Sequence, residues 1–155
     1  DADALRAVNI NKNERELQNC ILTPHYGEFS RLTGQEGKQI RNNPLESALE
    51  FSTENSIILN LKNAPSVVTT PSGEAYINST GNAALAKAGS GDVLAGIMIG
   101  LIGQGLETYR AACYANYIHG YVAELYVMNH DEYSLTPEKM LNWLPEAIKK
   151  INTYE

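Results

Sequence analysis

A helix that is apolar on all sides, entered through a glycine-rich turn, is the feature that most constrains this chain. The turn and the start of the helix read Lys87-Ala-Gly-Ser-Gly-Asp-Val-Leu-Ala-Gly96. From Asp92 to about Gly103 the residues are small and apolar around the whole circumference, which is typical of a helix inside a protein. The sequence therefore predicts a buried helix that begins at this turn.

The turn before this helix is suited to binding an anion. The first N–H groups of a helix have no partner within the helix, and the helix dipole favours negative charge there. Glycines at positions 89 and 91 let the backbone approach a phosphate closely. Asp92 would repel that phosphate, unless it serves as a base acting on a nucleophile beside the phosphate. The alternative is that Asp92 is an N-cap or a first-turn acid, since aspartate is favoured at both positions.

Strands and helices alternate along the chain. Short apolar runs predict strands at 20–23 and 56–61, and a hairpin of 66–70 and 74–78 around Pro71-Ser-Gly73. A turn is expected at 25–27. Helical spacing and capping residues predict helices at 28–32, 44–54, 107–128 and after Thr136, with a kink or restart at Pro145. We therefore expect an α/β fold with a mostly parallel central sheet, an antiparallel edge hairpin and flanking helices.

Composition and charge exclude two classes of partner. The 155 residues carry a net charge of −6 with no basic stripe, so we expect no nucleic-acid binding. No apolar run approaches the roughly 20 residues that span a bilayer, so we expect no membrane association. Cys20 and Cys113 are expected to be buried thiols rather than a disulfide, which fits a cytoplasmic enzyme.

Four motifs in a fixed order run through the chain. They are Asp1-Ala-Asp-Ala-Leu5, Leu22-Thr-Pro-His-Tyr-Gly-Glu28, Leu61-Lys-Asn63, and the glycine-rich stretch with Asn78-Ser-Thr-Gly-Asn82 before it. Together they resemble the ADP/ATP-dependent NAD(P)H-hydrate dehydratases of the ribokinase-like superfamily. The resemblance covers essentially the whole chain and implies a ribokinase-like layered sandwich. Because the chain opens on what reads as the end of a strand, we expect residues 1–155 to be the C-terminal portion of a single dehydratase domain.

The resemblance implies an enzyme that repairs a damaged nicotinamide cofactor. Water adds a hydroxyl to the reduced ring, and the enzyme would phosphorylate that hydroxyl from ADP or ATP. Phosphate, a far better leaving group than hydroxide, would then depart and restore NADH or NADPH. The implied partners are NAD(P)H hydrate, an adenine nucleotide and further copies of the chain, because relatives assemble as homo-oligomers. Mg²⁺ would bridge the nucleotide phosphates, with no dedicated metal site in the protein.

The resemblance also assigns roles to individual residues. Asp92 would accept the hydroxyl proton as general base, and the N–H groups of residues 89–91 would stabilise the transferring phosphoryl group. The implied substrate-binding residues are His25, Tyr26, Gly27, Glu28, Arg31 and Asp92. The implied nucleotide-binding residues are Lys62, Asn63, Ala64, Pro65, Ser66, Asn82, Ala88, Gly89, Ser90 and Gly91.

This chain departs from the family pattern at several positions. Asn63 and Ala88 replace usual glycines, Lys87 replaces a frequent threonine, and Tyr26 replaces a frequent proline. Asparagine tolerates a positive φ better than most residues, so the turn at 63 can survive the change. A positive φ at Ala88 would strain the glycine-rich turn and weaken nucleotide binding.

Other interpretations stay open for single residues and for the chain. His25 could bond a loop carbonyl, Arg31 could be a surface charge, and residues 62–66 could be a plain polar loop. His119 is expected to be a packed helical residue, not a catalytic one, and His130 a solvated one. For the chain as a whole, the alternatives are a ribokinase-like kinase acting on a small alcohol or vitamin precursor, and an inactive nucleotide-binding module.

Overall fold

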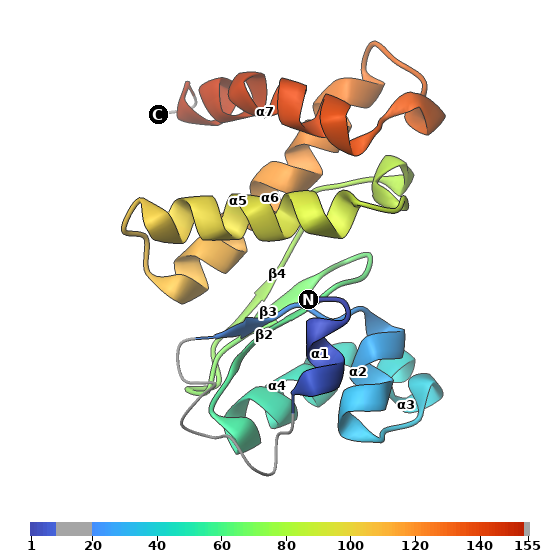
Figure 1. Ribbon diagram of the computed structural model, residues 1–155, viewed down its shortest axis with the longest axis vertical. Coiled ribbons are helices and arrows are strands. Elements are labelled where there is room, and N and C mark those ends of the chain that lie inside the picture. Colours follow the sequence, from blue (N-terminus) through green and yellow to red (C-terminus); the bar gives the residue numbers. More distant parts are fainter. Residues whose placement is uncertain (9–19, 154–155) are drawn as a thin grey trace. The chain divides into compact units, whose positions relative to one another are not determined.

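The computed structural model describes residues 1–8 and 20–153 of the chain (Figure 1). These residues form two compact units, Asp1–Asn78 and Ser79–Glu155. The first contains a small sheet with helices, and the second consists of helices alone.

The sheet of the first unit has four strands in the order β1-β2-β3-β4: Ile21–Leu22, Ile58–Leu61, Val67–Thr69 and Ala75–Ile77. β1 and β2 run parallel, whereas β2–β3 and β3–β4 are antiparallel. The expected hairpin of β3 and β4 is confirmed. The described strands nevertheless form a mixed sheet rather than a mostly parallel one, because the short connections after β2 and β3 can join only antiparallel neighbours.

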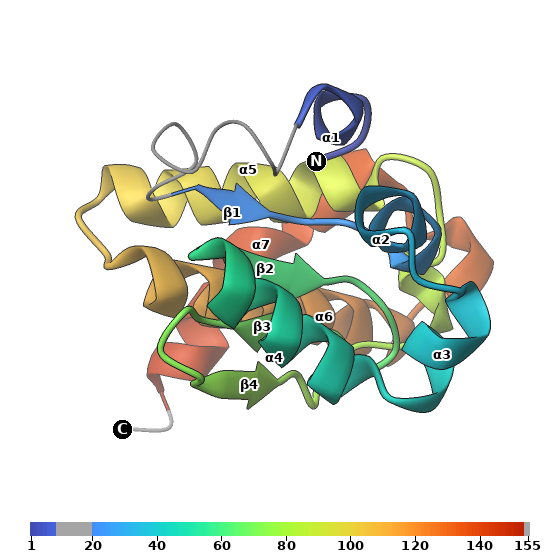
Figure 2. The same cartoon turned by 90° about the horizontal axis from the view of Figure 1, so that it is seen from below.

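Four helices accompany this sheet: α1 (Ala4–Ala7), α2 (Tyr26–Thr33), α3 (Gly37–Asn42) and α4 (Pro44–Asn55). α4 matches the expected helix at 44–54 and packs against β2 and β3 (Figure 2). The core between them is built from the buried side chains of Phe29, Ile40, Phe51, Leu59 and Leu61.

A buried hydroxyl pair joins α4 to β3. The Thr69 hydroxyl donates to the Ala48 carbonyl at 3.1 Å, so the Ser52 hydroxyl, 2.6 Å away, is the donor to Thr69. Both side chains are fully buried, and each has a partner, as buried polar groups require. The pair holds the helix in one position on the sheet.

The second unit is built around a long central helix. Its elements are η1 (Ala83–Leu85), α5 (Ser90–Gly103), α6 (Thr108–Val127), η2 (Glu132–Ser134) and α7 (Pro137–Asn152). α6 contacts both α5 and α7, and the expected helices at 107–128 and after Thr136 are confirmed. The Thr136 hydroxyl accepts from the Lys139 N–H at 3.3 Å, so this residue is the expected N-cap. α7 continues through Pro145 without a restart.

Burial of α5 differs from the expectation. Val93, Leu94 and Met98 are buried, but 70% of the Ile99 side chain is exposed, and Ile102 is exposed as well. Within its unit α5 packs on α6 and α7, which cover one side of it. The expectation of a fully buried helix is therefore wrong for the described residues. No described helix has both the length and the apolarity needed to cross a membrane.

Candidate functional site

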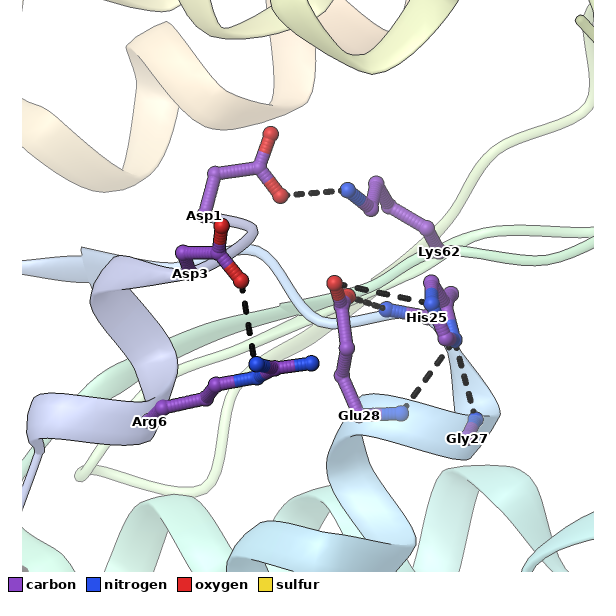
Figure 3. Close-up of polar contacts among 7 residues, drawn as sticks. All are labelled: Asp1, Asp3, Arg6, His25, Gly27, Glu28 and Lys62. Atoms are coloured by element: carbon purple, nitrogen blue, oxygen red, sulfur yellow. Dashed lines mark hydrogen bonds and ion pairs between the residues drawn. The ribbon is translucent and has the colours of Figure 1, made fainter. Parts of the chain in front are cut away.

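The predicted substrate residues of the first unit lie together on α2. His25 precedes this helix, and its Nδ1 accepts hydrogen bonds from the N–H groups of Gly27 at 3.0 Å and Glu28 at 3.2 Å (Figure 3). An imidazole nitrogen that accepts carries no proton, so neutral His25 has its proton on Nε2. His25 therefore caps a helix rather than bonding a loop carbonyl.

Glu28 completes a reciprocal cap at the same helix start. Its Oε2 accepts from the His25 backbone N–H at 2.8 Å, and its Oε1 lies 3.5 Å from His25 Nε2. The expected turn at 25–27 is therefore wrong beyond His25, because Tyr26 and Gly27 already form the first turn of α2. The carboxylate is largely buried, with 13% of its side chain exposed, whereas 55% of the His25 side chain is exposed. The imidazole edge is thus held in place but open to solvent.

A pocket of about 270 Å³ lies between α1 and α2. Arg31, which is on α2, and Arg6 bring positive charge to its wall, while Asp3 and Glu28 bring negative charge. Arg6 Nε is 3.4 Å from the Asp3 carboxylate (Figure 3). The remaining lining residues are apolar: Ala2, Leu5, Val8 and Leu32. The pocket combines an apolar surface with charged groups of both signs, which suits a polar organic ligand.

The predicted nucleotide-binding loop at 62–66 begins beside His25. The Lys62 N–H donates to the Pro24 carbonyl at 2.8 Å, and its ammonium donates to the Asp1 carboxylate at 2.5 Å (Figure 3). Within the loop, the Ser66 hydroxyl donates to the Asn63 carbonyl at 2.9 Å. The peptide bond between Ala64 and Pro65 is cis. The loop is therefore a closed turn at the end of β2, next to the capped start of α2.

The glycine-rich turn of the second unit is held from two sides. Gly89 has a φ of +84°, and a Cβ on it would lie 2.8 Å from Pro137 Cγ, so only glycine fits. The Lys87 ammonium donates to three backbone carbonyls, those of Glu132 at 3.0 Å, Tyr133 at 2.6 Å and Leu135 at 2.8 Å. The turn is thereby joined to the segment that precedes α7.

Asp92 lies in the first turn of α5, and its side chain is exposed. The N-cap of this helix is Gly89, so Asp92 is not the cap. Among residues 1–8 and 20–153, none forms a hydrogen bond or an ion pair with the Asp92 carboxylate. The Ser90 N–H donates to the Lys87 carbonyl at 3.3 Å, a long bond within the turn. The Asp92 carboxylate thus lies beside the first N–H groups of α5 and has no bonding partner among the described residues.

Residues before this turn are fastened to α6. The Thr80 hydroxyl donates to the Tyr117 carbonyl at 2.9 Å, and the Gly81 N–H donates to Glu124 Oε1 at 2.9 Å. A Cβ on Gly120 would lie 2.6 Å from the Thr80 carbonyl carbon, so the glycine allows the two backbones to touch. Asn82, a predicted nucleotide contact, then caps η1 by accepting from the Ala84 N–H at 3.0 Å.

The two replacements of usual glycines, Asn63 and Ala88, leave the backbone unstrained. In the described residues, positive φ outside glycine occurs at Ala2 and Ser56. Neither Asn63 nor Ala88 adopts it, so the anticipated strain at Ala88 is absent from this part of the chain. The glycine-rich turn places its left-handed residue at Gly89 instead.

Three residues make hydrogen bonds to the predicted site segments or near them that were not expected. Asp1 bonds Lys62 across the sequence, Lys87 bonds the segment before α7, and His119 bonds Ser90, with 3.1 Å between Nε2 and Oγ. His119 is buried as expected, and burial lowers the pKa of its imidazole to about 4. His130, expected to be solvated, is exposed but stacks on Tyr126. The family motif Asp1–Leu5 was the available signal for the first of these contacts.

Comparisons with known proteins agree with the motif order. A family model described as NAD(P)H-hydrate dehydratase matches residues 1–146. The bifunctional NAD(P)H-hydrate repair enzyme of Moorella thermoacetica is 37% identical over 153 residues, which cover 97% of this chain and 29% of that protein. The chain therefore spans much less than the full length of this relative.

Two solved structures are similar to the chain. The ADP/ATP-dependent NAD(P)H-hydrate dehydratase from Bacillus subtilis, co-crystallised with ATP/Mg²⁺, matches with a TM-score of 0.81 and 35% identity, over 84% of this chain and 47% of that one. A ribokinase-like superfamily protein from Enterococcus faecalis matches with a TM-score of 0.74 and 28% identity, over 84% of this chain and 44% of that one. The fold is therefore of the ribokinase-like kind, and the chain spans about half of each neighbour.

Proposed function

The chain belongs to the NAD(P)H-hydrate dehydratase family, and on this premise we propose that it carries out the nucleotide-dependent repair of hydrated NADH and NADPH. We propose further that residues 1–155 are the C-terminal portion of one such domain, in an enzyme that is cytoplasmic and homo-oligomeric. The observation that carries the proposal is the left-handed Gly89 turn leading into α5, with the Asp92 carboxylate exposed beside it.

The proposed reaction has two steps. In the first, the hydroxyl oxygen of the hydrate attacks the terminal phosphorus of ADP or ATP, the bond from that phosphorus to the bridging oxygen breaks, and AMP or ADP leaves. The hydroxyl proton passes to Asp92. In the second, the carbon–oxygen bond breaks, phosphate leaves with the electron pair, and the neighbouring ring carbon loses a proton as the double bond returns. The net products are NADH or NADPH, phosphate and the shortened nucleotide.

The parts of the second unit fit the first step. The first N–H groups of a helix can bind an incoming anion, and the helix dipole stabilises charge that develops on the transferred phosphoryl group. Asp92 stands next to them, where a hydroxyl attacking that group would need a base. The donor is ADP or ATP, as in the name of the Bacillus subtilis relative.

Magnesium is proposed to come with the nucleotide. The described residues contain no group of three or more His, Cys, Asp or Glu side chains that could hold a metal ion. Mg²⁺ commonly binds through nucleotide phosphates with only one or two protein ligands, so such a group is not needed. The ion would neutralise charge on the phosphates during transfer.

The first unit is proposed to bind the hydrate. The pocket between α1 and α2 presents the Arg31 guanidinium for a phosphate of the dinucleotide. His25 presents a fixed Nε2–H that can donate a hydrogen bond. Lys62 and the loop that follows it would contact the nucleotide, as the family motif implies.

The proposal is tested by incubating the protein with NADPH hydrate, Mg²⁺ and either ADP or ATP. Absorbance of reduced nicotinamide should return, with one phosphate released for each cofactor restored. A stable phosphorylated small alcohol, with no action on the hydrate, would instead identify a kinase. Binding of nucleotide without turnover of the hydrate would identify an inactive binding module.

A further inference from the structure

One buried polar pair connects the middle of α6 to the start of α5. His119 lies on α6, and its Nε2 is 3.1 Å from the hydroxyl oxygen of Ser90, the first residue of α5. Only 8% of His119 and 5% of Ser90 are exposed. The bond therefore lies inside the second unit, directly behind the glycine-rich turn.

Packing alone does not explain why a histidine occupies position 119. An apolar side chain would pack at this position without the cost of removing an imidazole from water. Burial lowers the pKa of His119 to about 4, although a hydrogen bond with the Ser90 backbone acts in the opposite direction. The ring is therefore neutral at physiological pH, and its Nε2 shares a hydrogen bond with the Ser90 hydroxyl.

The same stretch of α6 contacts the two segments of the second unit that contain predicted nucleotide-binding residues. Thr80 and Gly81 are bonded to Tyr117 and Glu124, which lie two residues before and five residues after His119 along the helix. His119 bonds the turn at Ser90. Thr80, Gly81 and Ser90 are therefore all bonded to α6, and His119 makes the bond to the glycine-rich turn.

We propose that His119 is a positioning residue that fixes Ser90 and thereby holds the N–H groups of the glycine-rich turn in the orientation that binds nucleotide phosphate. This rests on the proposed function for its ligand, but the contact itself belongs to the described fold. His119 does not touch the nucleotide in this scheme. Its effect passes entirely through Ser90, which is what makes the proposal testable.

The experiment is a double-mutant cycle on nucleotide affinity. ADP and ATP binding with Mg²⁺ is measured by calorimetry for wild type, His119→Ala, Ser90→Ala and the double variant. Loss of one neutral hydrogen bond should weaken binding about fivefold to tenfold in each single variant. Because His119 acts through Ser90, the double variant should bind no more weakly than the weaker single variant. Independent, multiplied losses would overturn the proposal.

Conservative variants separate positioning from packing. The amide of glutamine reaches as far as Nε2 of histidine, whereas that of asparagine reaches only as far as Nδ1. His119→Gln should therefore restore affinity to within about twofold of wild type, and His119→Asn should not. His130→Gln, which changes an exposed histidine just beyond the end of α6, is the matched control and should bind as wild type. Equal affinity of the Gln and Asn variants would contradict the proposal.

A readout without nucleotide distinguishes this inference from the proposed function. Hydrogen exchange of the amides of residues 89–92 should be about tenfold faster in His119→Ala than in wild type, and near wild type in His119→Gln. If wild type binds no adenine nucleotide, the proposed function fails, while the exchange data still decide whether His119 holds the turn. Unchanged exchange in His119→Ala, with the fold intact by circular dichroism, overturns the positioning role.

Discussion

Asp92 is the residue on which the proposed chemistry depends most directly. Its carboxylate is exposed in the first turn of α5, and no described residue bonds it. Replacing it with asparagine keeps the shape but removes the base. Asp92→Asn should lower kcat by about 10²–10⁴-fold, the usual contribution of a positioned general base, with nucleotide affinity changed by less than about threefold.

The control for this variant is Glu138→Gln. Glu138 is an exposed acid in the first turn of another helix, α7, so it matches Asp92 in its relation to a helix dipole. Steady-state kinetics with NADPH hydrate should show wild-type rates for it. If Asp92→Asn loses folding and nucleotide binding together, as judged by circular dichroism and calorimetry, Asp92 is a structural acid and not a base.

His119 links the stability of the protein to pH. Its pKa falls from 6.5 to about 4 on folding, so below pH 6.5 the unfolded chain takes up a proton that the folded chain refuses. The stability contribution is complete above about pH 6.5 and is lost as the pH falls toward about 4. Between pH 7.5 and pH 5 the loss should be about 2 kcal/mol.

Urea unfolding at the two pH values measures this contribution. Other groups also titrate in this range, so the quantity to compare is the difference between wild type and His119→Gln, which has no titrating ring. The variant should lose about 2 kcal/mol less than wild type on going from pH 7.5 to pH 5. Parallel losses in the two proteins would show that folding does not lower the pKa of this imidazole.

At the scale of elements, the cap of α2 allows the structural and functional roles of His25 to be separated. Asparagine is among the strongest N-cap residues, but it carries no group equivalent to Nε2–H. His25→Asn should therefore keep the unfolding free energy within about 0.5 kcal/mol of wild type, whereas His25→Ala should lower it by about 1 kcal/mol.

Activity then gives the second half of the test. If His25 contacts the hydrate, His25→Asn should raise the KM for NADPH hydrate by about fivefold to tenfold despite its normal stability. Thermal unfolding and steady-state kinetics on the same preparations give both quantities. Wild-type kinetics in His25→Asn would restrict this residue to capping α2.

Lys87 ties the start of α5 to the segment before α7. Its three bonds to backbone carbonyls are made by a half-buried ammonium, and bonds from charged donors are stronger than neutral ones. Lys87→Met should lower the unfolding free energy by about 1–2 kcal/mol, measured by urea unfolding. Lys149→Met, at an exposed lysine of α7, is the matched control and should be neutral. Equal stability of both variants would show that the three hydrogen bonds of Lys87 contribute nothing to the free energy of unfolding.

Most elements could be predicted because their ends carry local signals. Pro44 and Thr136 marked the starts of α4 and α7, and both helices begin where these residues predict. The starts of α2 and α5 lie two residues earlier than expected. The start of α2 was missed because histidine is not a usual N-cap. The start of α5 was missed because the sequence does not show which glycine of the turn, Gly89 or Gly91, is left-handed.

The contacts that join distant segments could not be predicted in the same way. Asp1 with Lys62, Ser90 with His119, and Lys87 with the carbonyls before α7 are separated by 29 to 61 residues. No local pattern encodes such pairings, because they form only when the elements pack. The order of the motifs, in contrast, was readable directly, and with it the residues of the candidate site.

At the scale of the whole molecule, candidate site residues occur in both compact units. The first holds the charged pocket between α1 and α2, and the second holds the glycine-rich turn and Asp92. The sheet shows why parallel order was overestimated: β2 is apolar enough to suggest a strand buried on both faces of a parallel sheet, yet the short connection after it makes β3 antiparallel to it. Strand burial alone does not determine strand direction.

This division predicts that variants of Arg31, in the first unit, and of Gly89, in the second, affect different substrates. Arg31→Gln, in the pocket, should raise the KM for NADPH hydrate about tenfold through loss of a charge-assisted bond, with the KM for nucleotide unchanged. Gly89→Ala should do the reverse. Its Cβ is disfavoured at a φ of +84° and meets Pro137, so the turn must shift, and nucleotide affinity should fall about tenfold or more. Kinetics with each substrate varied in turn measure both effects, and a rise in both KM values in either variant would contradict the division.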